Sequence, residues 1–352
     1  MMLAEVPVRP VFPDERMRRH PAPRFTTLTH FASALGTSLC LVLPACVASE
    51  AKSAGAGCIA PANPGGGWDF SCRAVSQALG AGAPGGAPLH VTNIPGEGGG
   101  VAFRSIVDRP KDAAPVIVAA SPSTLLGLAQ HHYGNHTERD VRWIAAVDAE
   151  PSIIAVSASS PWHTMSQFVA AWRAHPDSVI IGGTSATGGQ DHMKMLLLAR
   201  AAGIDVRHVR YQPVSTPAEA IAMVRAGTLQ VFPAELSKML PQVERKELRV
   251  LAVLGELRAP GLLASVPTAR EQGFDVVFMV WRGFYAPATT SDAVYQQWVD
   301  RLRSMSASAE WKNMLEKNGL TPYFLGGKDF ESFVAAQAAS YRTVSTDIGV
   351  VQ

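Results

Sequence analysis

Short apolar runs alternate with segments of helical periodicity along the chain from residue 58 onward. Most of these runs are apolar at nearly every position, which is the pattern of a strand buried on both faces in a parallel sheet. Strands that alternate with helices predict an α/β fold, built mainly from parallel sheets flanked by helices. The strand candidates are residues 58–62, 89–93, 116–120, 143–147, 153–157, 178–183, 206–211, 229–234, 248–254 and 276–281.

The predicted helices begin at recognisable residues. Thr164 and Thr216 each precede a helix, and Gln167 and Glu219 follow three positions later, which is the capping-box pattern. The apolar stripe along the first of these helices is expected to pack in the core rather than to hold a cofactor. Further helices are expected within residues 291–305, 308–319 and 329–348.

Composition narrows the class of protein. The chain has 352 residues, more than one compact core usually holds, so two lobes are expected. Charged residues make up 17% of the chain, against about 25% in an average soluble protein, and the net charge is +2. No run of Lys and Arg is interleaved with aromatic residues. We therefore expect no nucleic-acid partner.

The first 48 residues differ from the rest of the chain. Residues 17–24, "MRRHPAPR", are basic, whereas residues 31–48 carry no charge and end in small residues. This order is typical of a secretory signal peptide, so we expect residues 1–48 to be removed and the mature protein to be exported and soluble. Two alternatives stay open: a retained membrane anchor, or a lipoprotein signal in which Cys46 of "LPAC" bears the lipid.

The four cysteines divide between the signal segment and the mature chain. Cys40 and Cys46 leave with the signal peptide, and Cys58 and Cys72 remain. An exported protein lives in an oxidising compartment, so a disulfide between the remaining two is expected, linking the first strand to the helix after it. The alternative is a pair of buried free thiols.

Four loops rich in glycine or other small residues follow strand candidates. At least three run directly into a predicted helix, where several N–H groups lack an intrahelical partner and the helix dipole favours negative charge. Glycine lets a ligand approach the backbone, and Ser and Thr add hydroxyl donors. Such helix starts hold phosphate or carboxylate without a Lys or Arg. The loops are residues 63–69, 93–102, 182–192 and 211–220.

Nucleotide and hydrolase motifs fail in these loops. The dinucleotide fingerprint would need a glycine where Val101 stands, and no phosphate-binding G-x-x-x-x-G-K-[ST] occurs. The nucleophile elbow G-x-S-x-G is broken by Thr187. No cofactor is therefore expected, and an exported α/β protein with loops suited to anions is typical of a solute receptor.

Candidate metal and catalytic residues are weak. Residues 131–136, "HHYGNH", contain three histidines without the spacing of a metal site on a helix, so no metal is expected. Asp191 and His192 lie at the start of a predicted helix, where Asp is an ordinary cap. A catalytic pair there would need a nucleophile, and none is marked.

Several segments resemble the periplasmic substrate-binding proteins of tripartite tricarboxylate transporters, also known as the Bordetella-uptake-gene family. The likeness covers roughly residues 57–352, and within the family it is greatest to the tricarboxylate-binding branch, which has paired cysteines and "WRGFY". The segments are "CIAPANPGGGWDFSCR", "VTNIPGEGGGVAF", "DVRWIAAV", "GGTSATGGQDHMKMLLLARAAGID", "LRVLAVL", "VPTAREQGFDV" and "WRGFYAPA".

The resemblance implies a two-lobed clamshell of the periplasmic-binding-protein type II kind, which closes on a small carboxylate. The family holds the carboxylate by backbone N–H groups, hydroxyls and water in two glycine loops. Strands at 151–157 and 276–284 would cross between lobe one, residues 54–151 plus 279–352, and lobe two, residues 152–278. The two loops correspond to Gly66, Gly67, Trp68 and Asp69, and to Thr184, Ser185, Ala186, Thr187 and Gly188; Ser121 joins the expected ligand-binding set.

One loop departs from the family pattern. The segment after Tyr211 is usually rich in glycine, but here it reads "YQPVSTPAEA". The hydroxyls of Ser215 and Thr216 are expected to take over as donors, which alters the pose of the ligand. Arg282, beside a crossing strand, is a candidate cation for a second carboxylate, and an ion pair at the surface is the alternative.

Together with the resemblance, the sequence predicts a receptor in the periplasm for a di- or tricarboxylate such as citrate, and not an enzyme. The resemblance further implies a monomer that delivers the ligand to the large and small membrane subunits of a transporter. Two other functions stay open. One is a subunit that presents ligand to a membrane sensor kinase. The other is an exported enzyme acting on a carboxylate, with Asp69, Asp191 or His192 as its base.

Overall fold

The computed structural model describes residues 56–81, 88–318 and 320–351. The expected signal peptide, with Cys40 and Cys46, lies outside these residues. In the described part of the chain, no helix has both the length and the apolar character needed to cross a bilayer.

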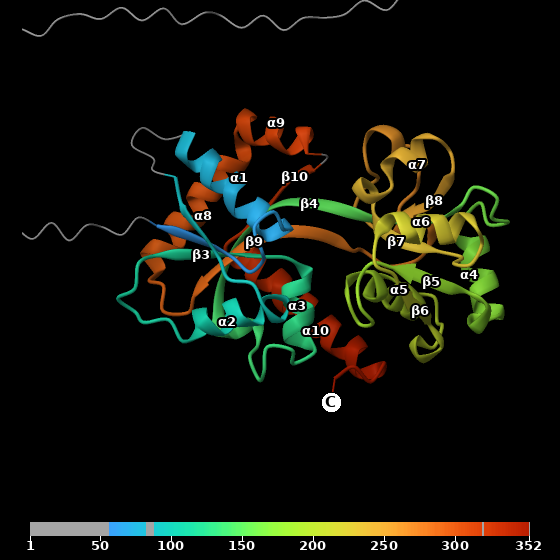
Figure 1. The fold of residues 1–352 in the computed structure, drawn as a ribbon, viewed down its shortest axis with the longest axis horizontal. Helices are drawn as coiled ribbons and strands as arrows, with labels where there is room; N and C mark the ends of the chain where they lie inside the picture. Colours follow the sequence, from blue (N-terminus) through green and yellow to red (C-terminus); the bar gives the residue numbers. More distant parts are fainter. Residues whose placement is uncertain (1–55, 82–87, 319, 352) are drawn as a thin grey trace, which may run out of the picture. The chain divides into compact units, whose positions relative to one another are not determined.

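The α/β fold is confirmed, and its helices and strands alternate along the described chain (Figure 1). The strands are β1 (Gly57–Ala60), β2 (His90–Asn93), β3 (Val116–Ala120), β4 (Val141–Ser157), β5 (Ile180–Gly183), β6 (Arg210–Pro213), β7 (Phe232–Glu235), β8 (Leu248–Val253), β9 (Met279–Pro287) and β10 (Thr321–Gly326). The helices are α1 (Gly67–Ala81), α2 (Gly100–Val107), α3 (Pro122–Ala129), α4 (Met165–Ala174), α5 (Gln190–Ala201), α6 (Pro217–Arg225), α7 (Leu240–Glu244), α8 (Asp292–Ala307), α9 (Ala309–Lys317) and α10 (Lys328–Asp347).

Strand β4 belongs to both lobes. Its first part pairs with β9 and β10, and its second part, from Ser152, pairs with β7 and β8. The strands joined through helices, β1–β2, β1–β3 and β5–β6, are parallel, whereas all pairings of β4 and β9 are antiparallel. The two-lobed arrangement follows from this exchange of partners, and the boundaries given above for the lobes stay a prediction.

Two predicted strands, 143–147 and 153–157, are one continuous strand, so their separation was wrong. Pro151 lies between the two predicted segments, and proline cannot donate to a sheet ladder. In the structure Pro151 lies opposite Met279, at the point where β4 changes from one set of partners to the other. The predicted N-caps are confirmed: the hydroxyls of Thr164 and Thr216 accept the N–H groups of Gln167 and Glu219.

The helices cover both faces of the large sheet. Helices α1, α8 and α9 pack on one face around the buried residues Cys72, Trp298 and Trp311. Helices α2, α3 and α10 pack on the other face, in a cluster that continues into the second lobe through Phe168 and Trp172, both fully buried. The stripe on α4 is therefore core, as predicted.

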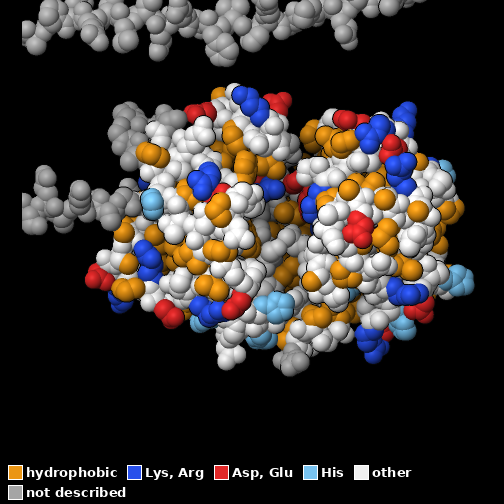
Figure 2. All heavy atoms as spheres, in the orientation of Figure 1, with side chains coloured by type: hydrophobic (Ala, Val, Ile, Leu, Met, Phe, Trp, Pro, Cys, Tyr) orange, Lys and Arg blue, Asp and Glu red, His pale blue; other side chains and the backbone are white. Residues whose placement is uncertain are grey.

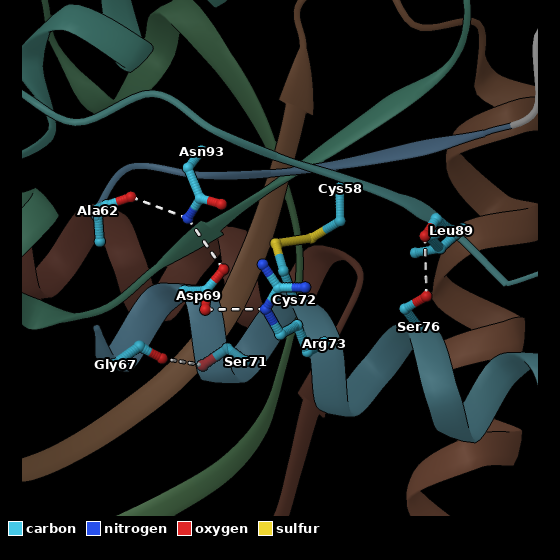
Figure 3. Close-up of a disulfide and its surroundings, with 10 residues drawn as sticks. All are labelled: Cys58, Ala62, Gly67, Asp69, Ser71, Cys72, Arg73, Ser76, Leu89 and Asn93. Atoms are coloured by element: carbon cyan, nitrogen blue, oxygen red, sulfur yellow. Dashed lines mark hydrogen bonds and ion pairs between the residues drawn. A yellow bond between two sulfur atoms is a disulfide. The ribbon is translucent and has the colours of Figure 1, made fainter. Parts of the chain in front are cut away.

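Cys58 and Cys72 form the expected disulfide, with their Cα atoms 5.6 Å apart (Figure 3). It joins β1 to the second turn of α1, so it holds together the two ends of the first glycine loop. Both cysteines are fully buried.

Removing this disulfide is expected to lower the free energy of unfolding by about 3 kcal/mol, because the bond closes a short loop that restricts the unfolded chain. Cysteines 14 positions apart close that loop. The Cys58→Ser/Cys72→Ser variant would be compared with the native protein by urea unfolding. The native protein treated with reductant should match the variant, and an unchanged midpoint in both would contradict the expectation.

Candidate functional site

The first glycine loop is held in shape by Asp69, in the first turn of α1 (Figure 3). One carboxylate oxygen of Asp69 accepts the N–H of Gly65 at 2.8 Å and the Nε of Arg73 at 2.9 Å. The other oxygen accepts the side-chain amide of Asn93 at 2.9 Å. Gly65 has a φ of +84°, which favours glycine. Asp69 therefore fixes the turn from within.

Three main-chain donors at this helix start point to no protein group. Gly66 donates its N–H to the carbonyl of Asn63 at 3.0 Å. Among the described residues, the N–H groups of Gly67, Trp68 and Asp69 have no hydrogen-bond partner. These are the first N–H groups of a helix, where an anion is favoured.

Asp69 is not a candidate base. The Arg73 guanidinium, followed by the N–H of Gly65 and the amide of Asn93, lowers the pKa of Asp69 to about 2, although burial opposes the shift. The carboxylate is thus ionised and engaged in three hydrogen bonds. Because Arg73 balances its charge, Asp69 does not cancel the attraction of the helix start for an anion.

The second glycine loop, residues 184–189, has the same construction. One carboxylate oxygen of Asp191, in the first turn of α5, accepts both the N–H and the hydroxyl of Thr184, at 2.8 and 3.0 Å. The other oxygen accepts the Nζ of Lys194 at 2.8 Å. Lys194 is fully buried and also donates to Glu235 on β7 at 2.7 Å.

Not all of the predicted donors in this loop are available. The N–H of Thr184 is used by Asp191, and the N–H of Gly188 donates to Nδ1 of His192 at 3.0 Å. In the described part of the chain, the N–H groups of Ser185, Ala186 and Thr187 have no partner. Each lobe therefore presents a run of three consecutive N–H groups beside a helix start.

His192 closes the second loop and is not available as a base. Its Nδ1 accepts from Gly188, its ring stacks on Tyr211 with centroids 4.5 Å apart, and only 4% of its surface is exposed. Burial lowers the pKa of His192 to about 4. The accepting Nδ1 makes the ring the neutral tautomer that carries its proton on Nε2.

This buried histidine should make the protein sensitive to acid. The folded pKa lies below the ordinary 6.5, so between pH 6.5 and 4 the unfolded chain binds the proton and the folded one does not. The free energy of unfolding should therefore decrease as the pH is lowered from 6.5 to 4, and this residue contributes up to about 1.4 kcal/mol per pH unit. His192→Gln keeps an acceptor for Gly188 and should remove this part of the slope.

Urea unfolding of both proteins at several pH values between 7 and 4 measures the difference in slope. Burial raises the pKa of Asp148 to about 6, which acts in the opposite direction, but this contribution is common to both proteins. Parallel stability curves for the native protein and the variant would contradict a buried neutral histidine.

Helix α3 connects the neighbourhoods of the two loops. Gln130, at its C-terminal end, donates to the carbonyl of Gly188 at 2.8 Å, and the hydroxyl of Ser123 accepts from the side chain of Gln190. Tyr133, three residues beyond Gln130, donates to the carbonyl of Gly98, in the glycine loop beside Trp68. Ser121 is the N-cap of α3 and accepts the N–H of Ser123. The start of α3, which Ser121 caps, therefore lies beside the start of α5.

The remaining predicted residues have local partners. Thr216 caps α6, and the N–H of Ser215, the residue before this cap, donates to the carboxylate of Glu219 at 2.9 Å. The Arg282 guanidinium pairs with Asp148 on the neighbouring strand at 2.7 Å. That carboxylate is 3% exposed, so the ion pair is more buried than the surface pair we considered. A role for any of the three in ligand binding stays a prediction.

Other site types find little support in these geometries. Within the described ranges, no group of three or more His, Cys, Asp or Glu side chains is arranged to hold a metal ion. On the face shown in Figure 2, basic and acidic side chains are interspersed, and no continuous basic surface is visible.

Known proteins are similar along most of the chain. The profile of the tripartite tricarboxylate transporter family receptor matches residues 74–350. A UPF0065 protein of Bordetella pertussis is 25% identical over 299 residues, covering 83% of this chain and 88% of that protein. Two solved structures share the fold, and in each case the match covers 98% of the chain of the solved structure. A TctC solute-binding protein from Polaromonas has a TM-score of 0.72 at 21% identity over 83% of this chain. MatC from Rhodopseudomonas palustris, with bound malate, has a TM-score of 0.61 at 18% identity and is matched over 82% of this chain. The chain therefore belongs to the receptor family of the tripartite tricarboxylate transporters.

Proposed function

We propose that this receptor binds a small di- or tricarboxylate of the citrate kind outside the cytoplasm. It delivers this ligand to the large and small membrane subunits of a tripartite transporter. The protein acts as a monomer and does no chemistry on its ligand. Lobe one, residues 54–151 plus 279–352, and lobe two, residues 152–278, close around the carboxylates.

The observation that carries this proposal is the pair of unused N–H runs. Gly67–Asp69 present three consecutive main-chain donors at the start of α1, and Ser185–Thr187 present three just before α5; in each case an aspartate of the helix already satisfies the donor that shapes the turn. Consecutive free N–H groups of this kind suit the oxygens of a carboxylate. A ligand with two or more carboxylates can then occupy both runs.

The two aspartates also argue against the enzyme alternative. The oxygens of Asp69 and Asp191 are engaged with main-chain donors and basic side chains, and Nδ1 of His192 accepts from Gly188. All three side chains are thus held by donors of the fold itself, whereas a general base must be placed to take a proton from the ligand. The bound malate of MatC is of the ligand class proposed here.

Isothermal titration calorimetry tests the proposal. The mature protein would be titrated with citrate, malate, succinate, glutamate and a neutral sugar. Trimethyl citrate is the matched control, because it keeps the citrate skeleton without its charges. Binding of a di- or tricarboxylate and no binding of the ester is expected. Binding of the sugar alone, or equal affinity for citrate and its ester, would contradict the proposal.

A further inference from the structure

A pocket lies where β4 passes between the lobes, and none of its lining residues belongs to the two glycine loops. It has about 810 Å³ of empty space, its open mouth included. Figure 1 shows the neighbouring elements, with β10 and α9 above β4 on the left and α7 above and to the right of it. The lining residues are Glu150, Pro151, Leu236, Ser237, Leu240, Ala259, Pro260, Asn318 and Thr321.

Glu150 is the charged residue of this lining. Only 4% of its surface is exposed, and one carboxylate oxygen accepts the N–H of Ser237 at 2.8 Å. Among the described residues, no Lys, Arg or His lies within ion-pair distance of Glu150. A buried carboxylate without a cation is costly, so its second oxygen calls for a positive partner.

The basic side chains near Glu150 already form ion pairs with other carboxylates. Three carboxylates of this region take part in ion pairs, and so do three cations. With Glu150 added, four carboxylates face three cations, which leaves one negative charge. The paired groups are Asp148 with Arg282, Asp191 and Glu235 with Lys194, and Glu235 with Lys238. Burial raises the pKa of Glu150, and the nearby charge of Glu235 adds to this, whereas the hydrogen bonds of Ser237 and the charge of Arg282 act against it.

The rest of the lining defines the shape of a suitable partner. Five lining residues are apolar and form a wall beside the carboxylate, whereas Ser237, Asn318 and Thr321 offer oxygen atoms. A hydrated metal ion on Glu150 would leave these apolar residues in contact with water, whereas an alkyl group would cover them. We propose that this pocket binds a small alkylammonium, with its charged group on Glu150 and its aliphatic part against the apolar wall. The apolar residues are Pro151, Leu236, Leu240, Ala259 and Pro260.

This site takes a cation, whereas the proposed carboxylate site takes an anion, so the two can fail independently. The probe is n-butylammonium chloride, titrated into the mature protein at pH 7.5 and followed by calorimetry. n-Butanol has the same alkyl chain without charge, and potassium chloride supplies a cation without the chain. We expect binding of butylammonium alone, and at least a tenfold loss of affinity in Glu150→Gln.

Glu244→Gln is the matched control, because Glu244 is an exposed residue of α7 and the substitution changes the net charge equally. It should bind as the native protein does. Leu240→Lys supplies an internal ammonium and should abolish binding even if Glu150→Gln fails to fold. The proposal is overturned if native protein does not bind butylammonium, which would mean that Glu150 holds a proton. It is also overturned if butanol binds equally well, or if Leu240→Lys or a folded Glu150→Gln retains native affinity.

Discussion

Replacing Lys194 with methionine is expected to lower the free energy of unfolding by about 3–5 kcal/mol. The Lys194 side chain is fully buried and donates to Asp191 and Glu235, which are themselves almost fully buried. Methionine fills similar volume but leaves two carboxylates without their common cation. Of the ion pairs of the described chain, this is the one whose loss strands the most buried charge.

Urea unfolding monitored by circular dichroism measures the change, and Lys238→Met is its matched control. Lys238 also pairs with Glu235, at 2.6 Å, but its side chain is 34% exposed, so water replaces it at a cost below about 1 kcal/mol. Adding Asp191→Asn and Glu235→Gln to Lys194→Met should restore part of the stability, because the stranded charges are then gone. A loss for Lys194→Met no larger than for Lys238→Met would contradict the buried network.

The variant should also bind anions more weakly. Asp191 holds Thr184, and with it the loop that presents Ser185–Thr187. With Lys194 removed, the negative charge of Asp191 is no longer balanced and opposes an anion at the helix start. Weaker binding of the carboxylate ligand by a folded Lys194→Met protein would show that the network serves the site as well as the fold.

The sequence predicted the parts of this fold that depend on local pattern. The apolar runs and the caps at Thr164 and Thr216 follow from local sequence patterns, and the structure has them. The disulfide followed from the expected export and the two cysteines left in the mature chain, and the structure has it too. The separation of residues 143–147 from residues 153–157 was wrong, because a proline such as Pro151 is tolerated where a strand changes partners. Whether a proline ends a strand depends on its tertiary neighbours, which the sequence does not display.

The site was predictable only in its outline. Glycine loops before helices indicated main-chain donors, but Thr184 and Gly188 use theirs inside the loop, which only the three-dimensional contacts reveal. The basic partners of the two aspartates had a signal, since Arg73 and Lys194 follow Asp69 and Asp191 by four and three positions, which is ion-pair spacing on a helix. No sequence pattern indicated the ion pair between Lys194 and Glu235, because Glu235 lies on a strand far along the chain.

The three glycines at 65–67 differ in what the fold requires of them. Gly65 has a left-handed φ of +84°. At Gly66 an added Cβ would lie 3.0 Å from the Cβ of Ala62 and 3.1 Å from the carbonyl of Asn63. At Gly67 a Cβ would meet nothing within 4 Å, and no left-handed φ occurs there. Among the glycines in the described part of the chain, Gly67 alone combines open space with an ordinary backbone.

Gly67→Ala should therefore leave stability within about 0.5 kcal/mol of the native value while reducing carboxylate affinity at least about tenfold. The added methyl group stands beside the N–H groups of Gly67, Trp68 and Asp69, where the ligand oxygens are proposed to approach. Calorimetry with whichever carboxylate binds best, together with urea unfolding, separates the two effects.

Gly65→Ala gives the opposite pattern and serves as the contrast. Its left-handed backbone should cost about 1 kcal/mol or more of stability. On the second loop, Ala186→Glu should abolish carboxylate binding by placing a negative charge among the donors, whereas Ala186→Gln adds the same bulk without the charge and should retain part of it. If Gly67→Ala and Ala186→Glu both bind like the native protein, the ligand does not lie against these main-chain donors. The glycines at 65–67 would then be needed only for the conformation of the turn, and the similar construction of the two loops would reflect folding and not ligand binding.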